Sequence, residues 1–159
     1  TTKSGLRLAS RPVREVEQLF TKVYSGEDLD MQQANDVMKQ FDGNDVLRIR
    51  MTLHMSHATE AGLNYRGQRI VNYDLNGNRL NGEFYATDDP GSMFLTADVY
   101  MDCSMAEVFV DGGLYSYSMG LDVHSTSKEG YVFWGNNIKI SSLEVYKVKS
   151  IWDGKVVEK

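Results

Sequence analysis

The sequence predicts an all-β fold, a two-sheet antiparallel β-sandwich, and three observations support this prediction. Glycine and asparagine mark turns at regular intervals, as in "LNGNRLNGE" (75–83) and "DGG" (111–113), while only two prolines occur in 159 residues. The runs between these turns are short and rich in β-branched and aromatic residues. Several runs alternate apolar and polar side chains, which is the pattern of strands with one face in a core. The length is sufficient for one such domain.

The expected elements fall into two parts of the chain. In residues 11–20, Pro12 suits the first turn of a helix, so one helical turn is expected there. Residues 31–41 carry apolar side chains near helical spacing but could equally end in a strand, and the sequence leaves this open. Strands are expected at 46–55, 61–65, 69–74, 82–87, 93–102, 105–111, 114–120, 131–134 and 138–149.

The composition argues against several classes of function. The net charge is −5 and no basic run is longer than a dipeptide, so no nucleic-acid partner is expected. No apolar run approaches the roughly 20 residues of a membrane span, so no membrane partner is expected. Cys103 is the only cysteine, which excludes an intramolecular disulfide and a cysteine-based metal site. No cofactor and no metal site are predicted.

The segment "YMDCSMAEVFVDGGLYSYS" (100–118) is predicted to form consecutive antiparallel strands. If "DCSM" (102–105) contains a two-residue turn, Tyr100 lies opposite Glu107 and Met101 lies opposite Ala106. One face then belongs to the core, and the other carries polar and aromatic side chains. The core face comprises Met93, Leu95, Ala97, Val99, Met101, Val108, Val110, Tyr115 and Tyr117. The other face comprises Asp98, Tyr100, Asp102, Glu107, Phe109, Ser116 and Ser118.

Three interpretations of this second face are open. Asp102 and Glu107 could be a glycosidase pair, but a turn-linked hairpin offers no evident cleft to hold two catalytic carboxyl groups. Tyr100 could form an aromatic platform for a sugar, with Asp102 and Glu107 accepting hydrogen bonds from its hydroxyls. Trp134, next to Gly135, could add a second platform. The residue chemistry alone favours a third interpretation, an ordinary solvated sheet face.

The longer stretch "MFLTADVYMDCSMAEVFVDGGLYSYSM" (93–119), which contains this segment, resembles the C-terminal β-sandwich of glycoside hydrolase family 32, the levanases, inulinases and invertases. Asp111 stands where asparagine is usual in the family. "LRLASRPVREVEQLF" (6–20) resembles the link between catalytic propeller and sandwich, "IVNYDLNGNRL" (70–80) resembles a family hairpin, and "ISSLEVYKVKSIW" (140–152) resembles the closing strand. The residues that match the family's central motif are Asp102, Ser104, Glu107, Val108, Phe109, Val110 and Gly112.

This resemblance implies a concanavalin-like sandwich of the jelly-roll type over residues 21–159, preceded by a linker over residues 1–20. The family's catalytic motifs are absent, so the chain is not expected to be an enzyme by itself and Asp102 and Glu107 are not expected to be a catalytic pair. The resemblance implies a propeller of the same polypeptide as the partner, with fructan or fructose as a second one. It also implies an extracellular or periplasmic location and an apolar patch near residues 6–20, where a propeller would pack.

Overall fold

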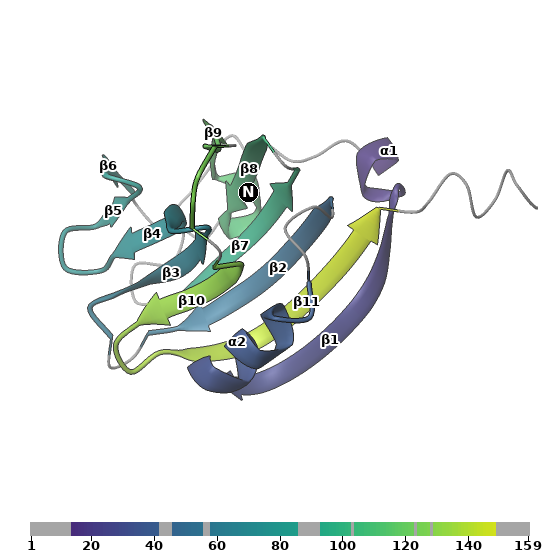
Figure 1. The fold of residues 1–159 in the computed structure, drawn as a ribbon. Helices are drawn as coiled ribbons and strands as arrows, with labels where there is room; N and C mark the ends of the chain where they lie inside the picture. The colour runs from purple at the N-terminus through teal and green to yellow at the C-terminus, as the bar shows by residue number, and fades with distance from the viewer. Residues whose placement is uncertain are drawn as a thin grey trace, which may run out of the picture.

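In a computed structural model, the described residues form two packed antiparallel sheets with two short helices (Figure 1). The described residues are 14–41, 46–55, 58–85, 93–102, 104–122, 124–127 and 129–148. The six-stranded sheet has the order β1-β11-β2-β7-β8-β9 and the five-stranded sheet has the order β10-β3-β4-β5-β6. The predicted two-sheet antiparallel sandwich is therefore confirmed.

The strand bounds agree with the sequence prediction over most of the chain. The six-stranded sheet contains β1 (Phe20–Asp30), β2 (Leu47–His54), β7 (Phe94–Met101), β8 (Met105–Val110), β9 (Tyr115–Gly120) and β11 (Lys139–Val148). The five-stranded sheet contains β3 (Glu60–Tyr65), β4 (Gln68–Asp74), β5 (Arg79–Leu80), β6 (Glu83–Phe84) and β10 (Tyr131–Gly135).

The predicted strand over 82–87 is an exception. The backbone turns at Asn78, Asn81 and Gly82, which all have positive φ, so two short strands, β5 and β6, lie on either side of the second turn. Residues 86 and 87 lie outside the described part of the chain.

The core lies between the sheets and is filled by alternate residues of the central strands. Leu47, Ile49, Met51 and Leu53 of β2 are almost fully buried, and burial of such a side chain stabilises the fold by roughly 1.5–3 kcal/mol. The Tyr117 hydroxyl of β9 donates to the Ile70 carbonyl oxygen of β4 at 2.6 Å and so joins the two sheets.

The register predicted for the hairpin at residues 100–107 is confirmed. Tyr100 lies opposite Glu107 and Met101 lies opposite Ala106, as a short turn after Met101 requires. The assignment of Met93 to the core is wrong, because 44% of this residue is exposed just before β7 begins. Cys103 lies outside the described residues.

Residues 14–30 form one short helix and one edge strand. Helix α1 (Arg14–Glu17) is the helical turn expected in 11–20, whereas Pro12 lies outside the described residues. Strand β1 forms an edge of the six-stranded sheet beside β11.

The segment at 31–41, which the sequence left open, contains helix α2 (Met31–Met38). A capping box starts it, in which the Gln33 amide donates to the Asp30 carboxylate and the Gln33 side chain accepts from the Asp30 amide. Asn35 then holds α2 against β10, because its side-chain amide accepts from the Phe133 amide at 2.6 Å and donates to the Phe133 carbonyl at 3.2 Å. The Asn35 amide therefore substitutes for a neighbouring strand at this sheet edge.

Candidate functional site

The candidate site lies on the face of the six-stranded sheet that points away from the core, here called the outer face. Its centre is a ladder of cross-strand pairs between β2 and β7, and each pair has a different chemistry. From one end to the other, the pairs are an aromatic stack, two hydroxyls, an ion pair and a cation–π contact. The pairs are His54–Phe94, Thr52–Thr96, Arg50–Asp98 and Arg48–Tyr100.

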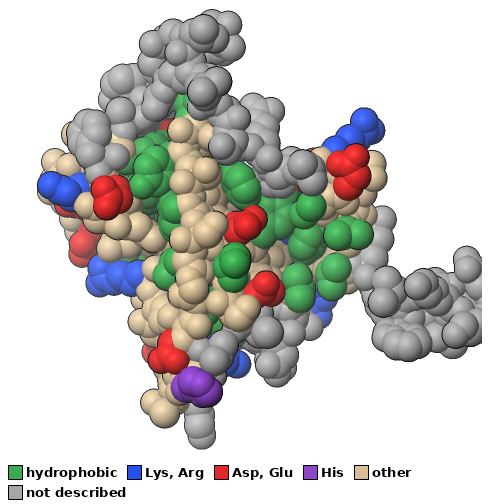
Figure 2. Space-filling model, turned by 90° about the horizontal axis from the view of Figure 1, so that it is seen from above, with side chains coloured by type: hydrophobic (Ala, Val, Ile, Leu, Met, Phe, Trp, Pro, Cys, Tyr) green, Lys and Arg blue, Asp and Glu red, His purple; other side chains and the backbone are tan. Residues whose placement is uncertain are grey.

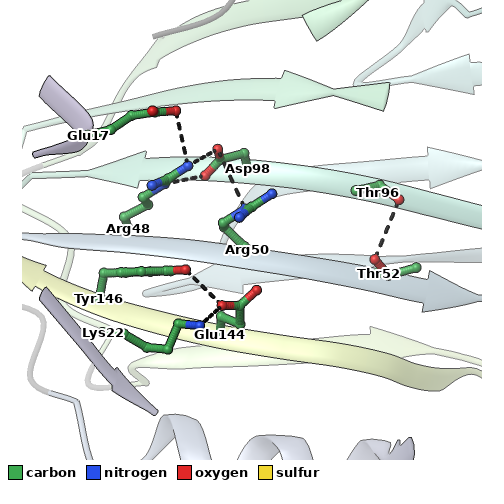
Figure 3. A network of polar contacts seen from close by, with 9 residues as sticks. All are labelled: Glu17, Lys22, Arg48, Arg50, Thr52, Thr96, Asp98, Glu144 and Tyr146. Carbon is green, nitrogen blue, oxygen red and sulfur yellow. Dashed lines mark hydrogen bonds and ion pairs between the residues drawn. The ribbon is translucent and has the colours of Figure 1, made fainter. Parts of the chain in front are cut away.

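Arg48 is the central residue of a polar network on this face (Figure 3). Only 8% of the residue is exposed, although it points away from the core. Its guanidinium donates two hydrogen bonds to the Asp98 carboxylate, 2.9 and 2.7 Å long, and a longer contact of 3.4 Å reaches Glu17 of α1. The rings of Tyr100 and Tyr146 lie on it at 5.2 and 5.1 Å from the ring centroids.

These contacts keep Arg48 charged despite its burial. Burial alone would lower its pKa, but the hydrogen bonds and the charge of Asp98 outweigh burial and raise the pKa above its usual value. Its Nε and Nη2 groups thus bond to carboxylates of the protein. The guanidinium anchors α1, through Glu17, to the middle of the sheet.

A second ion pair fixes the Tyr146 ring over Arg48. Lys22 of β1 lies 2.5 Å from the Glu144 carboxylate, which also accepts from the Tyr146 hydroxyl at 2.7 Å. The hydrogen bond from Lys22, and then that from Tyr146, lower the pKa of Glu144 against an opposing effect of partial burial. The edge strand β1 therefore supports the arrangement around Arg48.

The sequence analysis gave Tyr100 as a sugar platform, and the structure shows its ring in contact with protein. Besides Arg48, the ring makes edge contacts with Phe20 and Phe109 at 5.5 and 6.0 Å. Its hydroxyl oxygen is buried and has no hydrogen-bond partner among the described residues. Burial raises the pKa of Tyr100, and the charge of Asp98 adds to this effect. These contacts make Tyr100 a packing residue of the network.

Asp102 also has its hydrogen bonds inside the protein, in the turn between β7 and β8. Its carboxylate accepts from the amides of Ser104 and Met105 at 2.7 and 2.8 Å and from the Ser104 hydroxyl at 3.0 Å. The bond from the Ser104 amide is the main cause of a lowered pKa. A general acid of a glycosidase needs a raised pKa, so the effect at Asp102 is the opposite.

Glu107 and Trp134 complete the predicted set. Glu107 is exposed on the outer face, opposite Tyr100, and no described residue forms an ion pair with it. Trp134 does not join the other three residues, because β10 belongs to the five-stranded sheet. Its ring lies next to Gly62 and is covered by the Arg69 guanidinium at 4.4 Å. The structure therefore brings together Tyr100, Asp102 and Glu107 and separates them from Trp134.

An apolar groove of about 310 Å³ lies at the end of the outer face where α1 packs. Its apolar residues include Leu19, which is 54% exposed, and Met105, which is 41% exposed. In Figure 2, hydrophobic side chains gather beside acidic ones on the right-hand side of the molecule. The apolar patch expected near residues 6–20 is present in the described part of that segment. The groove is formed by Val16, Leu19, Phe20, Val46, Met105 and Val148, with Tyr100, Asp102 and Glu107 also lining it.

A second hollow, of about 730 Å³, lies between α2 and β10. Its floor includes the buried Met38 and Tyr131. Two of its charged residues, Asp36 and Lys39, pair with each other at 3.4 Å on the exposed side of α2. The described residues contain no group of three or more histidine, cysteine or acidic side chains placed to hold a metal ion. None of the described helices is long and apolar enough to cross a membrane.

Comparisons with known proteins give a consistent picture of the fold. No protein-family model and no curated protein matches the chain. A fructofuranosidase from Schwanniomyces occidentalis, solved with fructose, aligns with 92% of this chain at a TM-score of 0.59 and 10% identity. A sucrose-6-phosphate hydrolase from Lactobacillus gasseri aligns with 91% of it at a TM-score of 0.52 and 15% identity. An exo-inulinase from Aspergillus awamori aligns with 84% of it at a TM-score of 0.51 and 11% identity.

The chain has the fold of one part of these enzymes. It spans only 37%, 32% and 28%, respectively, of the three solved chains. The exo-inulinase is one of the kinds of enzyme whose C-terminal sandwich the sequence resembles. Identities this low show the fold and nothing further, so the concanavalin-like sandwich is confirmed and the role of the chain is a separate question.

The sequence analysis missed Arg48, Glu17, Glu144 and Tyr146 as parts of the outer face. A signal for Arg48 does exist in "LRIRMTLH" (47–54), where apolar and polar residues alternate and the first two polar positions are arginines. No comparable signal links Arg48 to Asp98, which lies 50 residues further along the chain.

Proposed function

We propose that this chain is a non-catalytic accessory domain of a glycosidase that hydrolyses fructan or sucrose, and that it flanks and stabilises a catalytic propeller of the same polypeptide. The observation that carries this proposal is the unequal coverage of the comparison. Nearly all of this chain aligns with about a third of each fructoside-hydrolysing enzyme. Polymeric fructans are extracellular, so we also propose an extracellular or periplasmic location.

The apolar groove is the surface that we assign to the propeller. Val16 and Leu19 line it and belong to the segment that resembles the link between propeller and sandwich, which supports this assignment. The contact of Glu17 with Arg48 holds α1 on the sheet and keeps these two residues in place. A groove of exposed aliphatic side chains is typical of a surface that another protein covers.

The acidic residues beside the groove indicate what the partner surface contains. Asp102 and Glu107 line the groove together with the apolar residues, and both are exposed. A propeller surface with an apolar centre and a lysine or arginine next to it would match this arrangement.

The bonding of Asp102 supports the non-catalytic assignment. The turn hydrogen bonds lower the pKa of its carboxyl, whereas the proton donor of a glycosidase pair needs a raised pKa. The test is to incubate the purified chain with sucrose, inulin and levan and to measure release of reducing sugar. We expect no hydrolysis, and hydrolysis that Glu107→Gln abolishes would refute the assignment.

The alternative function, a carbohydrate-binding module for levan or inulin, is favoured by one observation. The described part of the segment 21–42, residues 21–41, does not cover the outer face, because β1 extends the sheet at its edge and α2 packs against β10, β1 and β11. The exposed carboxylate of Glu107 therefore remains accessible to a ligand from this side.

A further inference from the structure

The outer face also carries the ring of Phe109, which forms a ridge between two hollows. Phe109 of β8 lines both hollows and is half-buried. One hollow, of about 370 Å³, lies over β2 and β7, and its lining includes Arg50, Thr96 and Asp98. The other, of about 300 Å³, lies over β8 and β9, and its lining includes Glu107, Ser116 and Ser118. These volumes are at the lower end of the range for small-ligand sites.

The hollow over β2 and β7 contains hydrogen-bond donors that the protein does not use. The Arg50 side chain is 48% exposed, and its only ion pair among the described residues is a long one, 4.0 Å from Nε to Asp98. Arg48 already occupies both oxygens of Asp98, so Arg50 is left with most of its five donors free. The Thr96 hydroxyl pairs with the Thr52 hydroxyl at 3.4 Å, and its oxygen keeps a lone pair that can accept from a ligand.

The hollow over β8 and β9 offers mainly hydrogen-bond acceptors. Ser118 lies directly opposite Glu107, and Ser116 lies opposite Phe109, so the two hydroxyls and the carboxylate face the same side of the sheet. A carboxylate and two hydroxyls on one side of Phe109 thus complement the guanidinium on the other side.

The side chains of the two hollows indicate which class of ligand fits the outer face. Aromatic rings, carboxylates, hydroxyls and an arginine together match a molecule with apolar ring faces and many hydroxyl groups. An anionic ligand would meet the carboxylates of Glu17, Asp98 and Glu107, with only Arg50 free to neutralise it. A purely apolar ligand would leave these polar groups without partners.

We propose that the outer face binds a neutral oligosaccharide across Phe109, with Arg50 donating hydrogen bonds on one side and Glu107 accepting them on the other. This proposal rests on the alternative function, the carbohydrate-binding module, and names its site. Glu107 is kept from the set that the sequence suggested, whereas Phe109 and Arg50 take the place of Tyr100 and Asp102. Tyr100 is a positioning residue, because its edge contact with Phe109 and its cation–π contact with Arg48 hold the ridge in place. Arg48 in turn fixes Asp98.

The experiment is a titration of the full chain, labelled with ¹⁵N, with inulin oligosaccharides and with levan oligosaccharides, followed by NMR and by calorimetry. We expect saturable shifts at the amides of residues 96–98, 107–109 and 116–118, with an affinity in the millimolar range or tighter. Arg50→Gln and Glu107→Gln should each weaken binding about five- to tenfold, because each removes hydrogen bonds to the ligand. Phe109→Leu, which keeps an apolar side chain, should weaken it by a similar factor.

Two controls decide the outcome. Arg69→Gln removes a cation from the five-stranded sheet and should leave the affinity unchanged, while oligogalacturonate, an anionic oligosaccharide, should bind at least tenfold more weakly than the neutral ones. The proposal is overturned if neither neutral oligosaccharide shifts these amides. It is also overturned if Arg69→Gln weakens binding more than Arg50→Gln does, or if oligogalacturonate binds equally well.

This test is independent of the docking proposal. A Leu19→Asp change in the apolar groove should leave the sugar titration unaltered, since Leu19 lines neither hollow. Failure of sugar binding would therefore leave the accessory role intact, and failure of docking would leave the sugar site intact.

Discussion

Replacing Asp98 with alanine should destabilise the fold more than replacing Arg48 with methionine, although both changes remove the same ion pair. In Asp98→Ala, Arg48 stays buried between two rings and keeps only the 3.4 Å contact with Glu17. It loses two charge-assisted hydrogen bonds, each worth about 1.5–3 kcal/mol. Because the Asp98 side chain is 20% exposed, we expect a loss of about 3 kcal/mol, the lower end for a broken buried pair.

Arg48→Met leaves the other partner behind in a more tolerant position. The Asp98 carboxylate can be rehydrated and can move toward Arg50, whose Nε already lies 4.0 Å away. The methionine side chain is flexible and apolar and can fill the space between the tyrosine rings. We therefore expect a loss of about 1 kcal/mol, well below that of Asp98→Ala.

Urea unfolding followed by circular dichroism measures both losses, and thermal unfolding checks them. In a protein of this size, 1 kcal/mol corresponds to roughly 2–4 °C in Tm, so Asp98→Ala should lower Tm by roughly 6–12 °C. Arg50→Met, a change of a half-exposed arginine on the same strand, is the matched control and should change stability by less than about 0.5 kcal/mol. The reasoning is wrong if Arg48→Met lowers the free energy of unfolding as much as Asp98→Ala does, or more, because an unpaired Arg48 would then cost no more than an unpaired Asp98.

Three further predictions concern the turn, the sheet packing and α2. Asp102→Ala should lower the unfolding free energy by about 1–2 kcal/mol and Asp102→Asn by less, because an asparagine oxygen still accepts from the turn amides. The pKa of Asp102 is lowered in the folded state, so its contribution to the free energy of unfolding should be complete above the unfolded pKa of about 3.9 and should be lost as the pH falls through the folded value. A carboxyl titration by NMR that finds a raised pKa would contradict this. Gly62→Ala should lower the free energy of unfolding by more than about 3 kcal/mol, because the added Cβ would lie 1.8 Å from a backbone carbonyl oxygen. Gly120→Ala should be nearly neutral, because a Cβ there faces open space. Equal unfolding midpoints for the two variants would contradict this packing. Asn35→Ala should cost about 1–3 kcal/mol and speed hydrogen exchange of the Phe133 amide, and unchanged exchange would show that α2 is held by other contacts.

Local patterns in the sequence were sufficient to predict the central hairpins. In residues 95–101 and 106–110, small or aliphatic side chains recur at every second position and the turn between the two runs is short, so the register follows from counting residues. Strand β1 was not predicted, because it is an edge strand whose residues are mostly exposed, and it therefore has no apolar face to reveal it. Helix α2 was left open, although Asp30 and Gln33 have the spacing of a capping box, a local signal that favours the helix.

The candidate site was harder to predict because its contacts are not local. The sequence placed Tyr100 opposite Glu107 correctly, but the residue that decides the environment of Tyr100 is Arg48, from another strand. Likewise, aromatic composition could not show that Trp134 belongs to the five-stranded sheet, since that depends on how β10 pairs with β3. Which strands become neighbours is set by the packing of the whole chain, and single-strand periodicity does not contain this information.

The most direct test of the accessory role is the affinity between this chain and the catalytic domain of its own polypeptide, produced separately and measured by calorimetry. The account predicts a complex that Leu19→Asp weakens at least tenfold, because a charge replaces an aliphatic side chain that the partner would bury. Val23→Asp, at an exposed valine that does not line the groove, should leave the affinity unchanged. No complex, or a complex that Leu19→Asp does not weaken, would contradict the account.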